Sequence, residues 1–188
     1  MSKAKIGTQA FLYPMPMAVI GAHVKGKTNY LAAAWLTRVN FNPPMIGVAL
    51  GKIHFTNQGI REHREFSVNI PNLDGMAAAD YVGLVSGMKT DKSWLYKPFY
   101  GELPHAPMIE SCPLTMECRV TQIVDLPSNE FVIGEIINAY CDESCLTDGK
   151  PDIAKMRPFV LTMPDNRYWA IGEMVGKAWS VGRKVHKE

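Results

Sequence analysis

Apolar and polar residues alternate along several short stretches of the chain, which is the pattern of half-buried β-strands. The clearest stretch covers residues 114–124, where Cys118 falls on the apolar side. After a turn at residues 126–130, residues 131–140 are expected to return antiparallel. The side chains expected to face inward on this returning strand are Phe131, Ile133 and Ile137.

The same pattern predicts further strands over residues 17–22, 29–34, 35–41, 45–50, 66–70, 159–163 and 168–172. Gly26 lies in a short polar turn between the first two of these, so we expect them to form a hairpin. Between the strands, short helices are expected from Thr56 and from Gly75, with Thr56 and Asp74 as their N-caps, and over residues 173–184.

This arrangement has six to eight strands, a few short helices and no regular alternation of strand and helix. It predicts a mainly β protein with short helical decorations, built as a closed or nearly closed antiparallel barrel. The length of 188 residues favours one domain over residues 1–188.

Composition narrows the possible partners and the location of the protein. A net charge of +2 gives no general electrostatic case for nucleic acid. No apolar run reaches the roughly 18 residues of a membrane span, and Pro14 and Pro16 interrupt the apolar patch near the N-terminus. The four cysteines form no CxxC pair. We expect a cytoplasmic protein with neither a nucleic-acid nor a membrane partner, and with no metal site.

The loop after the strand at 45–50 carries Lys52, His54, Thr56 and Asn57 just where a helix is expected to begin. Free amides at a helix start, a lysine and polar side chains together suit a phosphate group. A structural alternative is that Thr56 caps a surface helix and Lys52 is simply solvated.

Three successive alanines, at positions 32–34, interrupt the strand pattern with poor strand formers. Small side chains allow a flat molecule to approach the backbone closely. The alternative is tight packing against another strand. Downstream, the lysines of residues 86–92 could reach an anion or belong to a solvated loop.

Several classes of site find no support in the sequence. It contains neither a P-loop nor a GxGxxG motif, and no G-x-S-x-G elbow. The five histidines are dispersed, and no histidine stands at a metal-ligand spacing from the cysteines. Cys141 and Cys145 could form a disulfide or a redox pair, although a reducing compartment disfavours this pairing.

A set of short motifs, in this order and spacing, resembles the flavin reductase-like family of FMN-binding split barrels, and within it the flavoredoxins. The resemblance covers residues 14–182. The motifs are Pro14-x-Pro16, Asn29-x-x-Ala32-x-x-Trp35-x-Thr37, Asn42-Pro43-Pro44, Thr56-x-x-x-Ile60, Phe66-x-Val68-Asn69, Ser86-Gly87-x-x-x-Asp91-Lys92, Cys112-Pro113-Leu114-x-x-Glu117-Cys118 and Tyr168-x-x-x-Gly172.

The resemblance implies a six-stranded antiparallel Greek-key split barrel that forms a homodimer and binds one FMN per subunit. Residues 32–37 would lie along the flavin ring, while Lys52, His54, Thr56, Asn57 and Lys92 would hold the phosphate. No catalytic side chain is implied, because the chemistry takes place on the cofactor. The complete set of expected cofactor-binding residues is Asn29, Ala32, Ala33, Ala34, Trp35, Leu36, Thr37, Gly51, Lys52, His54, Thr56, Asn57 and Lys92.

The expected function is electron or hydride transfer by an FMN flavoprotein, and therefore an oxidoreductase. Its electron donor would be either NAD(P)H, as in a flavin reductase, or another redox protein, as for a flavoredoxin. The alternative is a binding module that keeps the barrel without redox activity of its own.

Overall fold

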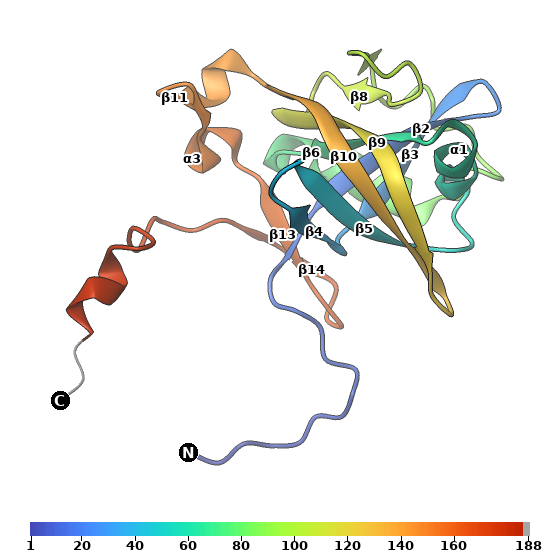
Figure 1. Ribbon diagram of the computed structural model, residues 1–188. Coiled ribbons are helices and arrows are strands. Elements are labelled where there is room, and N and C mark those ends of the chain that lie inside the picture. Colours follow the sequence, from blue (N-terminus) through green and yellow to red (C-terminus); the bar gives the residue numbers. More distant parts are fainter. Residues whose placement is uncertain (186–188) are drawn as a thin grey trace.

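The main sheet dominates the computed structural model, which describes residues 1–185 (Figure 1). Seven strands follow the order β3-β2-β6-β9-β10-β5-β4, and all neighbouring pairs are antiparallel. They are β2 (Ala18–Val24), β3 (Lys27–Ala33), β4 (Leu36–Asn40), β5 (Met45–Gly51), β6 (Glu65–Ile70), β9 (Leu114–Asp125) and β10 (Asn129–Cys141). The prediction of a mainly β fold is confirmed. The main sheet has seven strands rather than six, and it is not closed, because β3 and β4 lie at its two edges.

The hairpin of β2 and β3 forms as the sequence predicts. Its turn contains Lys25 at φ 52° and Gly26 at φ 77°, and Val24 pairs with Lys27. Two consecutive positive φ angles are typical of the tight turns that match the twist of antiparallel strands.

The direction in which β10 presents its side chains differs from the prediction. Val132 is 2% exposed and belongs to the barrel core, whereas Phe131 and Ile133 are only partly buried on the other face. A Cβ atom on Gly47 of the neighbouring strand would lie 2.3 Å from Cζ of Phe131, so the aromatic ring occupies the space beside that glycine. The inward assignment of Phe131 and Ile133 is therefore wrong.

The polar side of β9 is also more buried than alternation alone suggests. Thr115 and Glu117 are 1% and 0% exposed. The carboxylate of Glu117 accepts hydrogen bonds from the amides of Glu102 and Leu103 at 3.1 and 2.7 Å. An earlier, irregular segment, which contains Glu102 and Leu103, therefore covers this face of β9 and is fastened to it.

Three α-helices accompany the sheet: α1 (Thr56–His63), α2 (Met76–Leu84) and α3 (Ile153–Met156). Both predicted caps are wrong. Phe55 precedes α1 and makes no side-chain cap, while Asn72 caps a 3-10 turn, η1 (Leu73–Gly75), that leads into α2. Asp74 instead lies 3.4 Å from Arg157, on the surface.

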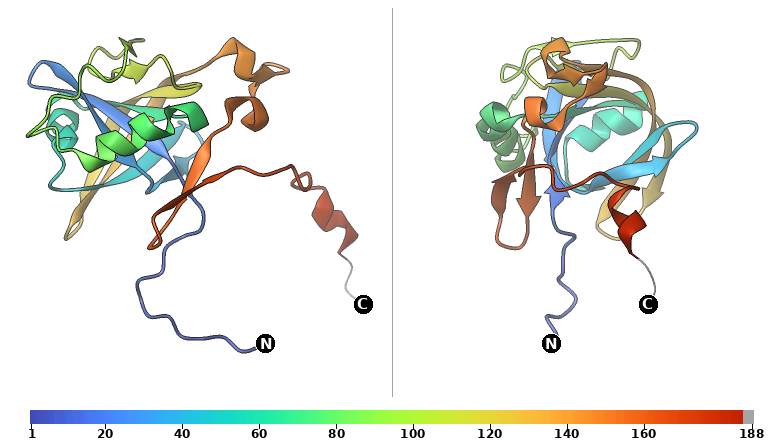
Figure 2. Two further views of the ribbon diagram at one scale, coloured as in Figure 1. Left: turned by 180° about the vertical axis from the view of Figure 1, so that it is seen from behind. Right: turned by 90° about the vertical axis from the view of Figure 1, so that its left-hand side faces the viewer.

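Two apolar clusters hold these elements together. One fills the barrel and includes Ile20, Phe66 and Cys118, which confirms the buried position expected for Cys118. The other lies between the outer face of β2 and β3 and helix α2, and it includes Tyr30 and Val82 (Figure 2). Helix α2 is thereby fixed beside β3.

A smaller sheet joins the two ends of the chain. Its order is β1-β13-β14, with β1 at Met15–Pro16, β13 at Phe159–Thr162 and β14 at Arg167–Ala170. The segments before β1 and after β14 extend away from the body as two arms (Figures 1 and 2). In the tail, the structure has only the 3-10 turn η3 (Val181–Lys184) in place of the helix expected over residues 173–184.

The remaining short elements are β7 (Pro98–Phe99), β8 (Met108–Ile109), β11 (Leu146–Thr147), β12 (Lys150–Pro151) and η2 (Glu143–Cys145). None of the helices within residues 1–185 is long and apolar enough to cross a membrane.

The contact between α1 and β2 yields a prediction for Gly59. A Cβ atom there would lie 1.8 Å from the carbonyl oxygen of His23, and backbone cannot move aside as a flexible side chain can. We expect Gly59→Ala to lower the free energy of unfolding by about 3 kcal/mol, measured by urea denaturation. In the matched control Gly172→Ala the new methyl group meets open space, and the change should stay within about 0.5 kcal/mol. Equal effects of the two substitutions would contradict this packing.

Candidate functional site

A cavity of about 330 Å³ lies between β3, the start of α1, the end of α2 and the segment that follows α2. Four of the residues predicted to bind a cofactor line it: Asn29, His54, Thr56 and Lys92. A second hollow of about 300 Å³ shares Asn29, Phe55 and Lys92 with the first. The fold thus gathers residues that are up to 63 positions apart in the chain, from Asn29 to Lys92.

Lys92 supplies the buried charge of this cavity, whose lining also includes the exposed Lys89. The side chain is 3% exposed, and its ammonium donates to the carbonyl oxygens of Val82 and Val85, both at 3.1 Å. These are among the last carbonyls of α2, where a cation is favourable. Burial lowers the pKa of Lys92 to about 8.

No carboxylate among the described residues lies within ion-pair distance of Lys92. An isolated buried charge is costly because it loses its hydration. An anionic group in the cavity would compensate that loss and use the remaining ammonium N–H. The site therefore fits a negatively charged ligand.

His54 lies on the loop between β5 and α1 and faces the same cavity. Burial lowers its pKa, and the nearby positive charge of Lys92 lowers it further. Gly51 allows this position, since a Cβ atom there would come within 3.2 Å of the imidazole Nε2. His54 is therefore a neutral hydrogen-bonding group near neutral pH.

Thr56 and Asn29 join the start of α1 to β3. The amide nitrogen of the Asn29 side chain donates to Oγ1 of Thr56 at 2.7 Å, and both side chains are buried. The hydroxyl group keeps its proton for a further partner. In the described part of the chain, the backbone amides of Phe55 and Thr56 also have no hydrogen-bond acceptor, whereas that of Asn57 donates to His54.

Gly87 belongs to the site although we did not predict it. A Cβ atom at this position would lie 2.3 Å from Oδ1 of Asn29 and 2.8 Å from the ring of Phe55. The segment after α2 can therefore press against β3 and α1 only with glycine there. The sequence carried one indication, because Gly87 stands in the Ser86-Gly87 motif of the family resemblance.

Two other expected phosphate ligands do not line the cavity. The ammonium of Lys52 lies 2.6 Å from the carboxylate of Asp125 on the surface. Asn57 donates instead to Gly51 O and to the carboxylate of Glu130, which also pairs with Arg61 at 2.8 Å. Lys52 is therefore a partly exposed surface residue that pairs with Asp125, and Asn57 anchors α1 to the sheet.

The alanine segment presents its three residues to different surroundings. Ala33 is 7% exposed and belongs to the barrel core. Ala32 faces α2, where a Cβ atom on Gly83 would come within 3.1 Å of its methyl group. The close-packing alternative thus applies to Ala32, with a helix rather than a strand as its neighbour, and any ligand contact here would involve the backbone.

The last residues of the expected ring segment line a separate cavity. Ala34, Trp35, Leu36 and Thr37 face a hollow of about 780 Å³ with mostly apolar walls. Asn29 and Ala34 are five positions apart, roughly 17 Å along an extended strand. Cationic and polar groups thus occupy one end of β3, and apolar surface lies at the other.

The bond between Asn29 and Thr56 can be tested without any ligand. We expect Thr56→Val to cost about 1–3 kcal/mol in urea denaturation, because it leaves the buried amide of Asn29 without its acceptor. In the matched control Thr121→Val, the hydroxyl is exposed, and the change should be under about 0.5 kcal/mol. A Thr56→Val variant as stable as the wild type would show that this bond does not hold α1 to β3.

Comparison with known proteins gives consistent relationships. The profile described as "Flavin reductase like domain" matches residues 10–161. The flavoredoxin from Methanosarcina acetivorans is 52% identical, with a TM-score of 0.96 over 97% of this chain and 98% of that one. The flavoredoxin of Desulfovibrio vulgaris (Miyazaki F) is 34% identical, with a TM-score of 0.90 over 96% and 100%.

An FMN-binding protein from Thermus thermophilus shares the fold at 21% identity, with a TM-score of 0.78 over 94% of this chain and 98% of that one. The family profile spans most of the chain, and the barrel matches both flavoredoxins throughout. The resemblance predicted from the motifs is confirmed. This chain belongs to the flavin reductase-like domain family.

Proposed function

We propose that this protein binds FMN and transfers electrons as a flavoprotein of the flavoredoxin type. The observation that carries the proposal is Lys92, a buried cation with no carboxylate partner in the described structure, in a cavity next to β3. A single phosphate group suits this cavity, and family membership supports a flavin as the rest of the ligand.

The phosphate would be held by Lys92, His54, the hydroxyl of Thr56 and the free amides of Phe55 and Thr56. Asn29 would position Thr56 through their 2.7 Å hydrogen bond. The flavin ring would lie along the backbone of residues 32–37, since the alanine side chains offer no polar group. Gly51 leaves room for the imidazole of His54 and would therefore affect phosphate binding only through the position of His54.

When bound, the flavin supplies the hydride and electron chemistry, so the protein needs no catalytic acid or base of its own. The chain's residues bind the phosphate, orient the ring through main-chain groups, and exclude water on the side of α2. Backbone N–H groups near the ring would stabilise negative charge that develops there.

The surface next to the proposed position of the flavin ring favours a redox protein over NAD(P)H as the electron donor. A dinucleotide needs cations for its phosphates, and no charged side chain lines the apolar cavity at the ring end of β3. Arg38, the nearest cation in sequence, donates to the carbonyl oxygens of Asn40 and Phe41. The proposal therefore favours an electron carrier over an NAD(P)H-dependent reductase.

The proposal includes a homodimer of single-domain subunits in the cytoplasm. Its support is an apolar edge, because Trp35 and Phe41 beside and after β4 are 46% and 90% exposed. A contiguous exposed apolar patch marks an interaction surface, and Trp35 also belongs to the mostly apolar wall of the 780 Å³ cavity. The four cysteines are all free, which suits a reducing compartment and gives no support to a disulfide between Cys141 and Cys145.

The absorption spectrum of the purified protein tests the function directly. We expect the visible bands of a flavin, either as purified or after adding FMN and removing the excess. Under anaerobic conditions, NADH or NADPH should leave these bands unchanged, while dithionite bleaches them. Rapid bleaching by NAD(P)H would favour the reductase, and a protein that stays colourless with FMN would contradict flavin binding altogether.

Substituting Lys92 should distinguish the contribution of the phosphate to FMN affinity from the contribution of the flavin ring. A hydrogen bond to a charged group contributes roughly 1.5–3 kcal/mol, which is about ten- to a hundredfold in affinity. We expect Lys92→Met to lose that much affinity for FMN, but little for riboflavin, which lacks the phosphate. Lys52→Met is the matched control and should change neither, because Lys52 pairs with Asp125. Loss of FMN binding in Lys52→Met alone would favour the arrangement predicted from the sequence.

The pH dependence of FMN affinity follows from the same lysine. The charged form of Lys92 persists below its pKa of about 8 and is lost as the pH rises. Because the phosphate binds the charged form, affinity should fall by up to about tenfold per pH unit above pH 8. Titrations at pH 7, 8 and 9 should show this fall for FMN, with constant affinity for riboflavin and a flat profile in Lys92→Met. A flat wild-type profile would exclude Lys92 as the titrating group.

A further inference from the structure

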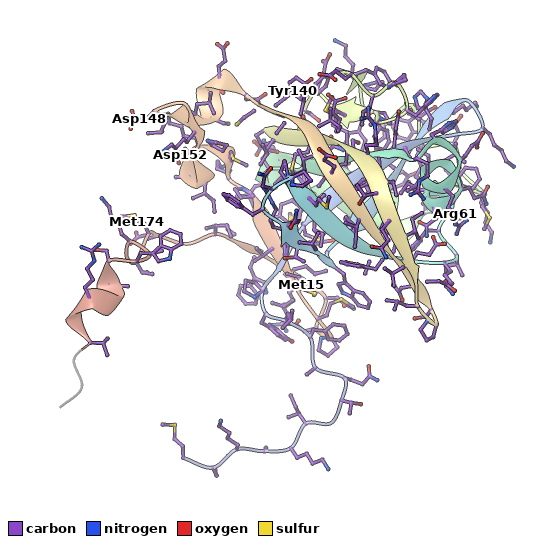
Figure 3. All side chains as sticks on the ribbon, in the orientation of Figure 1. Met15, Arg61, Tyr140, Asp148, Asp152 and Met174 are labelled. Atoms are coloured by element: carbon purple, nitrogen blue, oxygen red, sulfur yellow. The ribbon has the colours of Figure 1, made fainter. Side chains whose placement is uncertain are left out.

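Three of the five histidines lie in contact with one another and form what we call the histidine cluster. His23 lies on β2, His63 is the last residue of α1, and His105 belongs to the irregular segment between β7 and β8. The rings of His63 and His105 stack with centroids 3.9 Å apart and planes 14° apart, and the ring of His23 meets that of His105 edge-on at 5.5 Å. Figure 3 labels Arg61, which lies on α1 two residues before His63.

Gathered histidines often bind a metal ion, but this cluster is not arranged for one. Within residues 1–185, no group of three or more histidine, cysteine, aspartate or glutamate side chains could hold a metal ion. The two stacked imidazoles direct their nitrogen lone pairs along nearly parallel planes, so the lone pairs do not converge on one point. The remaining chemistry of imidazole near neutral pH is the gain and loss of a proton.

The contacts within the cluster require uncharged imidazoles. The Nδ1 atoms of His23 and His105 lie 3.4 Å apart, which permits a weak hydrogen bond when one nitrogen carries a proton and the other accepts it. If both rings are protonated, both nitrogens are donors and the contact becomes repulsive. The stacked pair of His63 and His105 is equally sensitive, because 3.9 Å is far below the screening length of about 8 Å in physiological salt.

Two carboxylates and one phenol face the cluster. The Glu65 carboxylate accepts a hydrogen bond from the backbone amide of His105 at 2.8 Å, and the Tyr100 hydroxyl lies 2.9 Å from Nε2 of His23. Glu62, whose side chain is 63% exposed, lies 3.9 Å from Nε2 of His63. The ion pairs of the described residues include none with His23 or His105. Positive charge on these two rings would therefore have no close counter-charge.

The charged groups of the neighbouring elements do not supply one. Glu102, in the same segment as His105, accepts a hydrogen bond from Asn138 of β10 at 3.1 Å. Arg64, directly after α1, donates to a backbone carbonyl of β9 at 3.4 Å. Arg119 lies opposite Glu65 in the pairing of β9 with β6. Both arginines add positive charge to the surroundings of the cluster.

Acid therefore charges the cluster against its surroundings. Burial lowers the pKa of His23, positive charge on His105 and on His63 lowers it further, and Glu65 only partly opposes them. The unfolded chain thus binds this proton more readily than the folded protein does. The stability that comes from the neutral cluster is fully present above about pH 6.5, the ordinary pKa of histidine, and it decreases as the pH falls below that value.

The cluster is joined to the helix that begins at the phosphate site. The amide of His23 donates to the carbonyl oxygen of His105 at 3.2 Å. The carbonyl oxygen of His23 lies against α1, close to Gly59. His63 is the last of the eight residues of α1 and Thr56 is the first. Such a helix is only about 12 Å long and moves as one unit, so a displacement at His63 also displaces Thr56.

We propose that the histidine cluster is a pH-sensitive contact: its protonation separates α1 from the segment between β7 and β8 and thereby weakens phosphate binding at the start of α1. The inference rests on the proposed function only for the identity of the ligand, FMN. The effect of protonation on folding stability is independent of that function.

Urea denaturation of the FMN-free protein at pH 7.5 and pH 5.5 tests the contact itself. His63→Gln keeps a polar side chain that never becomes charged, and His63→Lys supplies a charge at both pH values. We expect the unfolding equilibrium constant of the wild type to rise about tenfold more on acidification than that of His63→Gln, since every other titrating group is common to both. His63→Lys should already be less stable than His63→Gln at pH 7.5. Equal pH dependence in the wild type and His63→Gln would overturn the proposal.

NMR titration of the histidine ring protons distinguishes electrostatic coupling from a merely structural role. In both His63→Gln and His105→Gln, the midpoint for His23 should move to higher pH, because one neighbouring positive charge is lost. A midpoint for His23 that is the same in the wild type and in both variants would show that these rings do not sense one another's charge, and it would overturn the proposal.

The affinity for FMN, followed by flavin fluorescence at the same two pH values, tests the connection to the phosphate site. Titration of the phosphate, His54 and Lys92 affects the wild type and His63→Gln alike and cancels when they are compared. We expect the wild type to lose at least threefold more affinity on acidification than His63→Gln. An equal loss would overturn the connection to the phosphate site. If FMN binds to neither protein, the proposed function fails, and the urea and NMR measurements still decide on the cluster.

Discussion

A lysine ammonium withdrawn from water is the feature on which this site depends. Lys92 is held by the last carbonyls of α2, at Val82 and Val85, and these oxygens carry only partial negative charge. They reduce the cost of burying the cation without neutralising it. The position of α2 against β3 therefore leaves an uncompensated positive charge next to the start of α1. A bound anion can neutralise this charge.

The barrel makes this arrangement rigid through contacts that lie outside the cavity. Gly59 lets α1 approach the backbone of β2, and the carboxylate of Glu130 holds α1 through Arg61 and Asn57. With α1 fixed, the loop that carries His54 is fixed as well. Two adjacent residues thus have different roles: Thr56 faces the cavity, whereas Asn57 anchors α1 to the sheet.

The sequence predicted the strands well, because alternation along each strand reflects local packing. It also identified Asn29, His54, Thr56 and Lys92, all of which meet in one cavity. It could not show that Lys92 lines the cavity and Lys52 does not, since this depends on where Asp125 and the end of α2 lie in space. Neighbouring position in the chain favoured Lys52, whereas the tertiary structure favours the lysine that lies further away.

Other errors have the same origin in long-range contacts. Phe131 was assigned to the interior from its apolar character, yet Gly47 on the adjacent strand leaves room for its ring on the opposite face. Three of the histidines, although dispersed in the sequence, also lie close together. The rings of His63 and His105 stack with their centroids 3.9 Å apart, and His23 lies beside His105. No periodicity in the chain could reveal these contacts, because each depends on how elements that are distant in the sequence pack in the tertiary structure.

The pKa of the Lys92 ammonium, followed by NMR in protein with labelled lysine side chains, tests the central claim most directly. The account predicts a pKa of about 8 without ligand. It also predicts a clear rise when FMN binds and no rise with riboflavin. A pKa near 10.4, the ordinary value for lysine, in the free protein, or one that does not respond to FMN, would contradict the claim that a buried cation awaits a phosphate.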